Sequence, residues 1–304
     1  MSIIERAANQ AARKSTKSIV ELAADRLSGP AEPEDAAATK VAPSPAREDS
    51  SDTSNGLESQ RQITIDFDRL RARGFALPQD HSPVAEEFRL IKRPLLSVAL
   101  SDTLSGVENR NVIMVTSAAP NEGKTFVATN LAFSIASEHN TYVLLIDADV
   151  AKPSIPNLFG FDAEVGMLDA VADPKVDVGD VLIHTNIENL SILPAGRARP
   201  GMTELIASAR MAHFVSEVSR RYADRVIIFD SPPVLARSEP SVLAKHVGQV
   251  VLVVEAERTS RTAIEEALTL IGRDRIGGVV LNKAPHIIGQ EGFGQGYSYG
   301  YYDT

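Results

Sequence analysis

The segment 117–125 holds the residues best suited to chemistry, because it reads Ser-Ala-Ala-Pro-Asn-Glu-Gly-Lys-Thr. Loops of this composition wrap backbone N–H groups around phosphates, while the lysine reaches the β- and γ-phosphate oxygens and the hydroxyl binds Mg²⁺. The general pattern begins with a glycine, where this chain has Ala118. The segment therefore predicts a phosphate-binding loop for ATP and Mg²⁺. Its expected nucleotide contacts are Ala119, Pro120, Asn121, Glu122, Gly123, Lys124, Thr125 and Phe126.

Three carboxylates follow apolar runs further along the chain. Asp147 and Asp149 come after one such run, and Asp230 comes after another, with two prolines behind it. Taken alone, each is compatible with a simple polar strand end. Two carboxylates so close together are costly without a cation, which a Mg²⁺–ATP complex would supply. We expect Asp230 to hold Mg²⁺ together with Thr125 and one of the other two carboxylates, for which we choose Asp147.

Four of the six tyrosines lie in the last eight residues, and Gly294, Gly296 and Gly300 precede or separate them. Fully extended, the segment 289–304 would reach about 50 Å at roughly 3.3 Å per residue. A hydroxyl-rich tail on an ATP-binding domain suggests a kinase that carries its own substrate. The alternative is a low-complexity tail without a role. The expected phosphate acceptors are Tyr297, Tyr299, Tyr301 and Tyr302.

These motifs need a scaffold, and the apolar pattern predicts one of the α/β class. Buried strands are predicted at 112–116, 142–146, 190–193, 226–229, 250–254 and 279–281. Helical patterns separate several of them, near 124–137, 203–221, 237–246 and 261–272. Such alternation predicts a doubly wound, mostly parallel sheet with helices on both faces, and the phosphate-binding loop makes this sheet similar to that of P-loop NTPases. Ligands bind these sheets at the carboxyl ends of the strands, where the motifs fall.

Composition divides the chain into four parts. We expect an amphipathic helix at 1–27, a disordered linker at 28–60, an ATP-binding domain at 61–288 and the tail at 289–304. The helix either docks on a membrane partner or lipid surface, or is an ordinary amphipathic helix. The net charge of −9 gives no support for nucleic-acid binding, and the lack of cysteine excludes disulfides and thiol catalysis. No apolar run approaches the roughly 20 residues that cross a bilayer, so we expect a soluble chain unless a partner holds it at a membrane.

The three motifs in this order resemble those of the bacterial tyrosine kinases of the P-loop type. Within that family the chain is most similar to the exopolysaccharide tyrosine autokinases that accompany exosortase systems, on the basis of residues 1–5, 86–96 and 230–235. The resemblance implies a kinase domain at 61–288 and autophosphorylation between subunits of a homo-oligomer, for which a ring is one form. It also implies a role in exopolysaccharide synthesis and export. The implied activating partner is an inner-membrane chain-length regulator, which would place the chain in the cytoplasm, peripheral at the inner membrane.

The resemblance also implies roles for individual residues. Lys124 neutralises the β- and γ-phosphates, and Asp149 orients the incoming phenol or accepts its proton. The family's Glu-x-x-Arg-x-x-Arg pattern, which is implied in ring assembly, falls on Glu86, Arg89 and Lys92. The lysine at its last position departs from the pattern and places a bidentate contact there in doubt. From the residues alone, a solvated charged helix face is the alternative.

Two other functions compete with the kinase. A membrane-associated ATPase switch of the partitioning type typically has an additional lysine five residues before the loop lysine, where this chain has Ala119. A scaffold that binds nucleotide only to order a ring would not need the complete set of loop and carboxylate residues.

The family commonly has an arginine soon after the second aspartate, where this chain offers Lys152. Asn282 closes the last predicted strand and either reads the nucleotide base or forms a strand-end turn.

Overall fold

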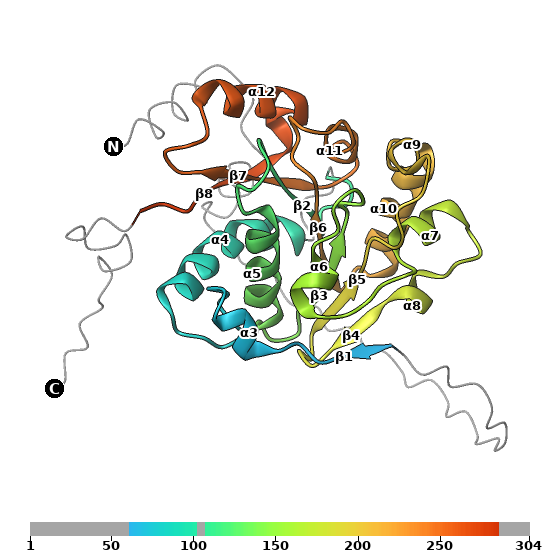
Figure 1. Cartoon of the computed structure of the whole chain (residues 1–304), viewed down its shortest axis with the longest axis horizontal. Coiled ribbons are helices and arrows are strands. Elements are labelled where there is room, and N and C mark those ends of the chain that lie inside the picture. The colour runs from blue at the N-terminus through green and yellow to red at the C-terminus, as the bar shows by residue number, and fades with distance from the viewer. Residues whose placement is uncertain (1–60, 102–106, 286–304) are drawn as a thin grey trace, which may run out of the picture.

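The computed structural model describes residues 61–101 and 107–285, whose strands form a single sheet (Figure 1). The strand order is β1-β4-β5-β3-β6-β2-β7-β8. Every pairing is parallel except that of β4 with β5. The strands are β1 (Gln62–Ile63), β2 (Val112–Ser117), β3 (Tyr142–Asp147), β4 (Ile183–Thr185), β5 (Leu190–Leu193), β6 (Arg225–Asp230), β7 (Gln249–Glu255) and β8 (Ile276–Asn282). The predicted α/β fold with a mostly parallel sheet is confirmed.

Helices cover both faces of this sheet, as the alternation of β2 side chains shows. Val112 and Met114 belong to one apolar core, which α7, α10 and α12 complete, while Ile113 and Val115 belong to a second core under α4 and α5. None of the helices in the described residues is long and apolar enough to cross a membrane. The helices are α3 (Phe67–Arg71), α4 (Pro83–Ala99), α5 (Lys124–Ala136), α6 (Ile155–Phe159), α7 (Met167–Ala172), α8 (Val178–Val181), α9 (Met202–Ile206), α10 (Ala209–Arg221), α11 (Glu239–Leu243) and α12 (Arg261–Ile271), with a 3-10 turn at Arg273–Arg275.

The six predicted strands are present, but the prediction that all of them are buried was wrong for β8, where Val279 is 52% and Leu281 48% exposed. The helix and edge-strand predictions were less accurate. The single helix expected at 203–221 was wrong, because α9 ends before Ser208 and the Ser208 side chain caps α10 by accepting a hydrogen bond from the Arg210 N–H. The edge strands β1 and β4 were not predicted, since two or three residues carry too little pattern. The helix, linker and tail expected at 1–27, 28–60 and 289–304 lie outside the described residues.

The strand order explains why the chemical motifs meet. β6 lies between β2 and β3, so the carboxyl ends of these three parallel strands share one edge of the sheet. Asp147 and Asp230 are register partners at that edge. The chain leaves β2 through the loop 118–123 and enters α5 beside them. Because helices cover both faces, these strands are apolar and buried, and their polar ends mark where a ligand can bind.

Candidate active site

The phosphate loop between β2 and α5 takes a shape that depends on two residues with positive φ. Asn121 has φ of 67° and Gly123 has φ of 93°. A Cβ on Gly123 would lie 2.0 Å from Nδ2 of Asn282, so a side chain there would displace Asn282 and would also strain the backbone at this positive φ. The Val127 N–H donates to the Gly123 carbonyl, so α5 begins directly at the loop. Its first free N–H groups and positive dipole end therefore face the loop, as anion binding requires.

A cavity of about 480 Å³ opens in front of this loop. The loop lines one side of the cavity, and the segments after β3 and β6 line the other. Lys152 and Arg237 add two exposed cations to its rim. The lining residues are Pro120, Asn121, Gly123, Lys124, Thr125, Asp149, Lys152, Ser154, Pro232, Pro233, Ala236 and Arg237.

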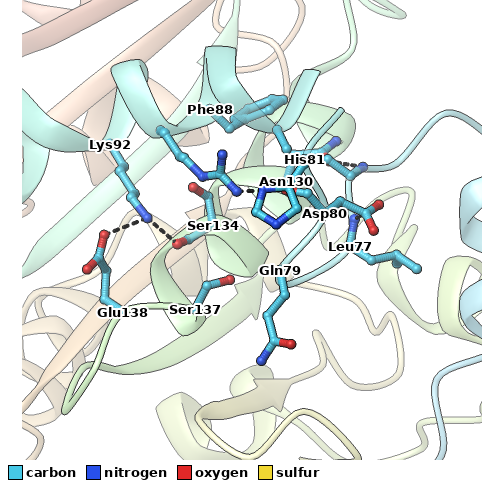
Figure 2. A pocket seen from close by; sticks show the side chains of 13 residues that line it. Leu77, Gln79, Asp80, His81, Phe88, Lys92, Asn130, Ser134, Ser137 and Glu138 are labelled. Atoms are coloured by element: carbon cyan, nitrogen blue, oxygen red, sulfur yellow. Dashed lines mark hydrogen bonds and ion pairs between the residues drawn. The ribbon is translucent and has the colours of Figure 1, made fainter. Parts of the chain in front are cut away.

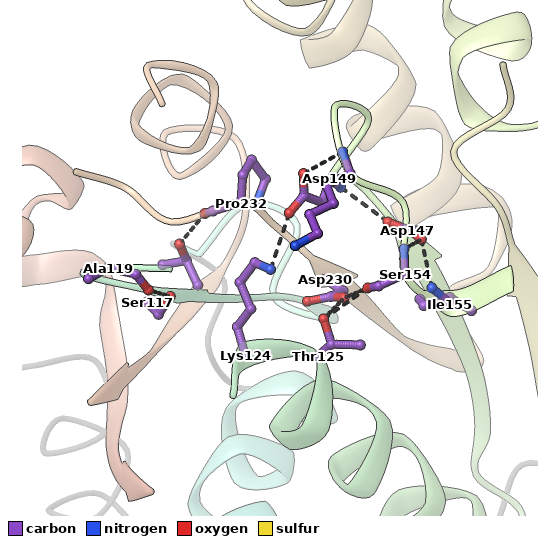
Figure 3. A network of polar contacts seen from close by, with 12 residues as sticks. Ser117, Ala119, Lys124, Thr125, Asp147, Asp149, Ser154, Ile155, Asp230 and Pro232 are labelled. Carbon is purple, nitrogen blue, oxygen red and sulfur yellow. Dashed lines mark hydrogen bonds and ion pairs between the residues drawn. The ribbon is translucent and has the colours of Figure 1, made fainter. Parts of the chain in front are cut away.

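One corner of the cavity combines hydroxyl and carboxylate oxygens (Figure 3). Thr125 Oγ1 donates to Asp230 Oδ2 at 2.7 Å, and Ser154 Oγ lies 3.0 Å from Thr125 Oγ1. The other carboxylate oxygen of Asp230 is buried and has no hydrogen-bond partner. Such an oxygen beside a threonine hydroxyl fits Mg²⁺, which keeps waters and phosphate oxygens and takes one or two carboxylates. The described residues contain no group of three or more acidic, histidine or cysteine side chains that could hold a metal without such help.

Asp147 lies behind this corner and is held by backbone N–H groups. Its Oδ2 accepts hydrogen bonds from Ser154 at 2.9 Å and from Ile155 at 3.0 Å, and its Oδ1 accepts one from Asp149 at 3.2 Å. These contacts fold the segment after β3 against the cavity. Burial and the charge of Asp230 raise the pKa of Asp147 to about 8. Its position fits a metal contact less directly than that of Asp230.

Burial also raises the pKa of Asp230, to about 6, although the charge of Lys124 and the Thr125 hydroxyl act in the opposite direction. Two neighbouring buried carboxylates are each costly to ionise, because the low dielectric disfavours charge and like charges repel. A divalent cation at this corner would offset that cost. The electrostatics thus agree with the hydrogen-bond geometry in favouring a cation site.

Lys124 and Asp149 both line the cavity and form an ion pair there (Figure 3). Lys124 Nζ lies 3.1 Å from Asp149 Oδ2, and the other oxygen of Asp149 accepts from the Lys152 N–H at 3.1 Å. Incoming phosphate oxygens compete for the same ammonium. Binding of a phosphate would therefore turn Lys124 toward the ligand and leave the Asp149 carboxylate free to interact with a hydroxyl.

The structure brings most of the predicted nucleotide residues together, but not all of them face the cavity. Ala119 and Glu122 are not among its lining residues. Phe126 is partly buried and packs against the core, with its ring centroid 4.9 Å from that of Phe75. Asn282 Nδ2 donates to the Glu122 carbonyl at 2.8 Å, on the rear side of the loop. Reading of the base by Asn282 stays a prediction.

Ser154 is the residue of this site that the sequence did not reveal. It contacts both Thr125 and Asp230 through its hydroxyl and Asp147 through its N–H. The available signal was its place before Ile155 and Pro156, which is typical of a helix start. That signal indicates α6, but it does not indicate that the hydroxyl reaches the site.

The charged residues of α4 form a separate cluster beside a second cavity of about 400 Å³ (Figure 2). Glu86 pairs with Arg89, and Arg89 also donates to the Asp80 carbonyl at 2.7 Å. Lys92 is only 5% exposed, and its Nζ lies 2.6 Å from the Ser134 carbonyl. This cluster does not touch the phosphate loop cavity. The four predicted acceptor tyrosines lie outside the described residues.

Comparison with known proteins fits the same fold and site. Residues 108–291 match a family model described as ParA: NUBPL iron-transfer P-loop NTPase, which covers more than half of the chain. The chain is 30% identical over 207 residues to CapB of Staphylococcus aureus, a candidate tyrosine-protein kinase by name, covering 67% of this chain and 86% of CapB. It is 32% identical over 174 residues to the tyrosine-protein kinase wzc of Salmonella typhimurium, covering 57% of this chain. That match spans 24% of the length of wzc.

Among solved structures, the crystal structure of the chimerical protein CapA2B2 is similar, with a TM-score of 0.59 and 30% identity. The likeness covers 74% of this chain and 93% of that one. The fold and the loop define a P-loop NTPase of the ParA type. Within that class, the chain belongs to the family of bacterial tyrosine-protein kinases.

Proposed function

We propose that this chain is an ATP-dependent protein-tyrosine autokinase that phosphorylates the tyrosines of its C-terminal tail, between subunits, in exopolysaccharide synthesis and export. The observation that carries the proposal is the corner formed by Thr125 and Asp230. There a buried, unpaired carboxylate oxygen lies next to the phosphate loop. Lys124 and Asp149 form an ion pair in the same cavity, which gives the site a phosphate-binding cation and a group for the acceptor hydroxyl.

The chemistry follows from positions of these groups. Thr125 and Asp230, with Asp147 behind them, would hold Mg²⁺, which would neutralise phosphate charge. Lys124 stabilises the charge on the transferred phosphate, as do the first N–H groups of α5. A phenol of pKa about 10 is protonated at neutral pH, so it must be oriented and must lose its proton during transfer.

Asp149 would orient the acceptor phenol once Lys124 has moved to the phosphate. The bond from the γ-phosphorus to the β–γ bridging oxygen breaks, a bond to the tyrosine oxygen forms, and the phenol proton passes to Asp149. The products are phosphotyrosine and ADP. Because the transition state for phosphoryl transfer is loose, positioning and charge stabilisation contribute more than prior deprotonation.

The setting is proposed from family membership. An inner-membrane chain-length regulator would activate the kinase and hold it in the cytoplasm at the membrane surface. We propose that the chain forms a homo-oligomer, and that the exposed Glu86 and the partly exposed Arg89 make contacts between its subunits. Lys92 would support that surface from inside by fixing α4 to α5.

The test is to incubate the purified chain with MgATP and to map phosphate on the peptide 284–304, which trypsin releases after Lys283. We expect phosphotyrosine in the wild type and a loss of at least about 100-fold in Lys124→Met, because the variant loses transition-state charge stabilisation. Circular dichroism checks that the variant stays folded. ATP hydrolysis without phosphotyrosine would overturn the kinase and favour a partitioning-type ATPase switch.

A further inference from the structure

The buried carboxylate of Glu122 links the phosphate loop to the end of β7 on the side of the loop away from the cavity, called the rear of the loop below. Glu122 is 3% exposed and is not among the residues that line the cavity. Its Oε2 accepts the Ala119 N–H at 2.8 Å, and its Oε1 accepts the Thr259 hydroxyl. Thr259 Oγ1 in turn accepts the Glu255 N–H at 3.0 Å. One side chain thus closes the loop on itself and connects it to a neighbouring strand.

A second tie comes from the end of β8. Lys283 Nζ donates to the Asn121 carbonyl at 2.6 Å and lies 3.3 Å from Glu255 Oε2. The adjacent Asn282 donates to the Glu122 carbonyl at 2.8 Å. Glu255 therefore contacts both ties, one through its N–H and one through its carboxylate. The other oxygen of that carboxylate lies 3.5 Å from the exposed Arg258.

The position of Glu122 is unexpected on electrostatic grounds. A carboxylate inside a loop that receives a triphosphate repels the ligand, and the low exposure leaves this repulsion poorly screened. The residue must therefore contribute in another way. Ala118 replaces the first glycine of the general pattern, and Asn121 holds a left-handed conformation that is costly for a residue with a side chain. Contacts from outside the loop are what keep such a conformation in place.

We propose that Glu122, Thr259, Glu255 and Lys283 form a rear brace, which keeps the loop N–H groups directed at the phosphates without touching the nucleotide. The four side chains are positioning residues. The proposal rests on the proposed function, since it takes MgATP as the ligand of the loop. Besides Glu122 in the loop itself, it assigns nucleotide affinity to three residues more than 130 positions away in sequence, at 137 positions for Thr259 and 162 for Lys283.

Long-range electrostatics and the brace predict different effects on nucleotide affinity, and substitution of Glu255 distinguishes the two explanations. Removing an anion near the phosphates would strengthen binding if only long-range electrostatics mattered. In the brace, Glu255→Gln removes the ionic anchor of Lys283 and so weakens binding. Lys283→Met weakens binding in both cases, whereas Lys283→Arg keeps the charge and the donors and should restore most of the affinity.

The experiment measures the Kd of a fluorescent ATP analogue with Mg²⁺, together with KM and kcat for tail phosphorylation in the full chain. We expect Lys283→Met and Glu255→Gln to raise Kd and KM about tenfold, the usual cost of a charge-assisted hydrogen bond, with kcat at saturation within about twofold of the wild type. The exposed residues Lys245 and Glu257 provide matched controls. Lys245→Met and Glu257→Gln should leave Kd unchanged.

Two results would overturn the brace while the kinase proposal stands. One is wild-type affinity or tighter binding in Glu255→Gln, which would assign the effect of Lys283 to charge alone. The other is failure of Lys283→Arg to recover binding beyond Lys283→Met. A wild-type chain that binds no nucleotide would overturn both proposals. A wild type that binds nucleotide but transfers no phosphate would overturn only the kinase, because the Kd comparison among variants still tests the brace.

Discussion

The phosphate loop cavity and the charged face of α4 each contain a lysine beside a carboxylate, yet the two lysines are used differently. Lys124 meets Asp149 at 3.1 Å at the wall of an open cavity. Lys92 meets Glu138 at 2.7 Å and also donates to the Ser134 carbonyl at 2.6 Å, which completes its contacts inside the subunit. Figures 2 and 3 show the two arrangements. Lys124 matches the phosphate-loop motif, whereas Lys92 stands where the family pattern has an arginine.

The two clusters differ in how many buried polar groups lack a partner that a ligand could supply. A buried polar atom without a partner costs about 1–3 kcal/mol, so a fold that keeps one gives up stability there. The cavity keeps such an atom in Asp230, and it keeps two carboxylates with raised pKa values. The α4 cluster has its charges paired within the chain. The cavity is therefore suited to an incoming cation and phosphate, whereas the contacts of Lys92 join α4 to the segment 134–138.

The largest effect that would test this contrast is expected from Asp230→Asn. Loss of the metal-facing carboxylate should lower tail phosphorylation by at least about 100-fold, because charge on the transferred phosphate is no longer offset. The same variant should be more stable than the wild type without nucleotide, by about 1–3 kcal/mol at pH 7. Thermal unfolding and phosphotyrosine measurements on the same preparation check both parts. Asp224→Asn, at an exposed aspartate, is the matched control.

The sign of the stability change follows from proton binding. The pKa of Asp230 is about 6 in the folded chain and 3.8 as a free group, so the folded state binds more protons between these values. Stability is therefore lost as the pH rises through that window, and the penalty is present in full above it. Asparagine removes the ionisation but can still accept from Thr125. A destabilised Asp230→Asn would contradict the account of this corner as a strained, ligand-ready site.

Lys92→Met is expected to produce the opposite pattern. It should lower the free energy of unfolding by about 1–2 kcal/mol, because the Ser134 carbonyl and Glu138 lose their partner, while half-exposure of Glu138 limits the cost. Nucleotide affinity of the monomer should stay at the wild-type value. Denaturant unfolding and the Kd for MgATP are the measurements, and the exposed neighbour Arg93→Met is the control.

The competing outcome for Lys92 is also informative. Unchanged stability with a smaller oligomer in light scattering would assign Lys92 to a contact between subunits, as the family pattern implies. If both the stability and the oligomer size decreased, the oligomer surface of α4 would depend on the contacts of Lys92 inside the subunit. Only the first result would contradict the contrast between the open phosphate loop cavity and the α4 cluster, whose charges are paired within the chain.

The sequence predicted the parts of this fold that repeat a pattern over several residues. The strands of the central sheet are continuous apolar runs, so they could be read directly, and the aspartates that follow them could be placed at one sheet edge. β1 and β4 could not be predicted, because two- and three-residue strands exist only through their partners. Ser154 and Glu122 show the other limit. Their contacts join segments 76 and 137 positions apart, which no local pattern encodes.

The smallest expected effect concerns Lys152, which lines the cavity near the place where the family commonly has an arginine. The backbone N–H of Lys152 donates to Asp149 whatever the side chain, so a substitution removes only the exposed ammonium. Lys152→Met should raise KM for ATP about two- to fivefold at low salt, and the difference should fade as ionic strength rises, because exposed charges are screened within about 10 Å at 0.1 M salt. Lys175→Met, an exposed lysine at a different cavity, controls for the loss of one positive charge. A salt-independent effect would show that Lys152 makes a desolvated contact with the phosphates. Lys152 would then be one of the residues that bind the nucleotide directly, and not an exposed charge at the rim of the cavity.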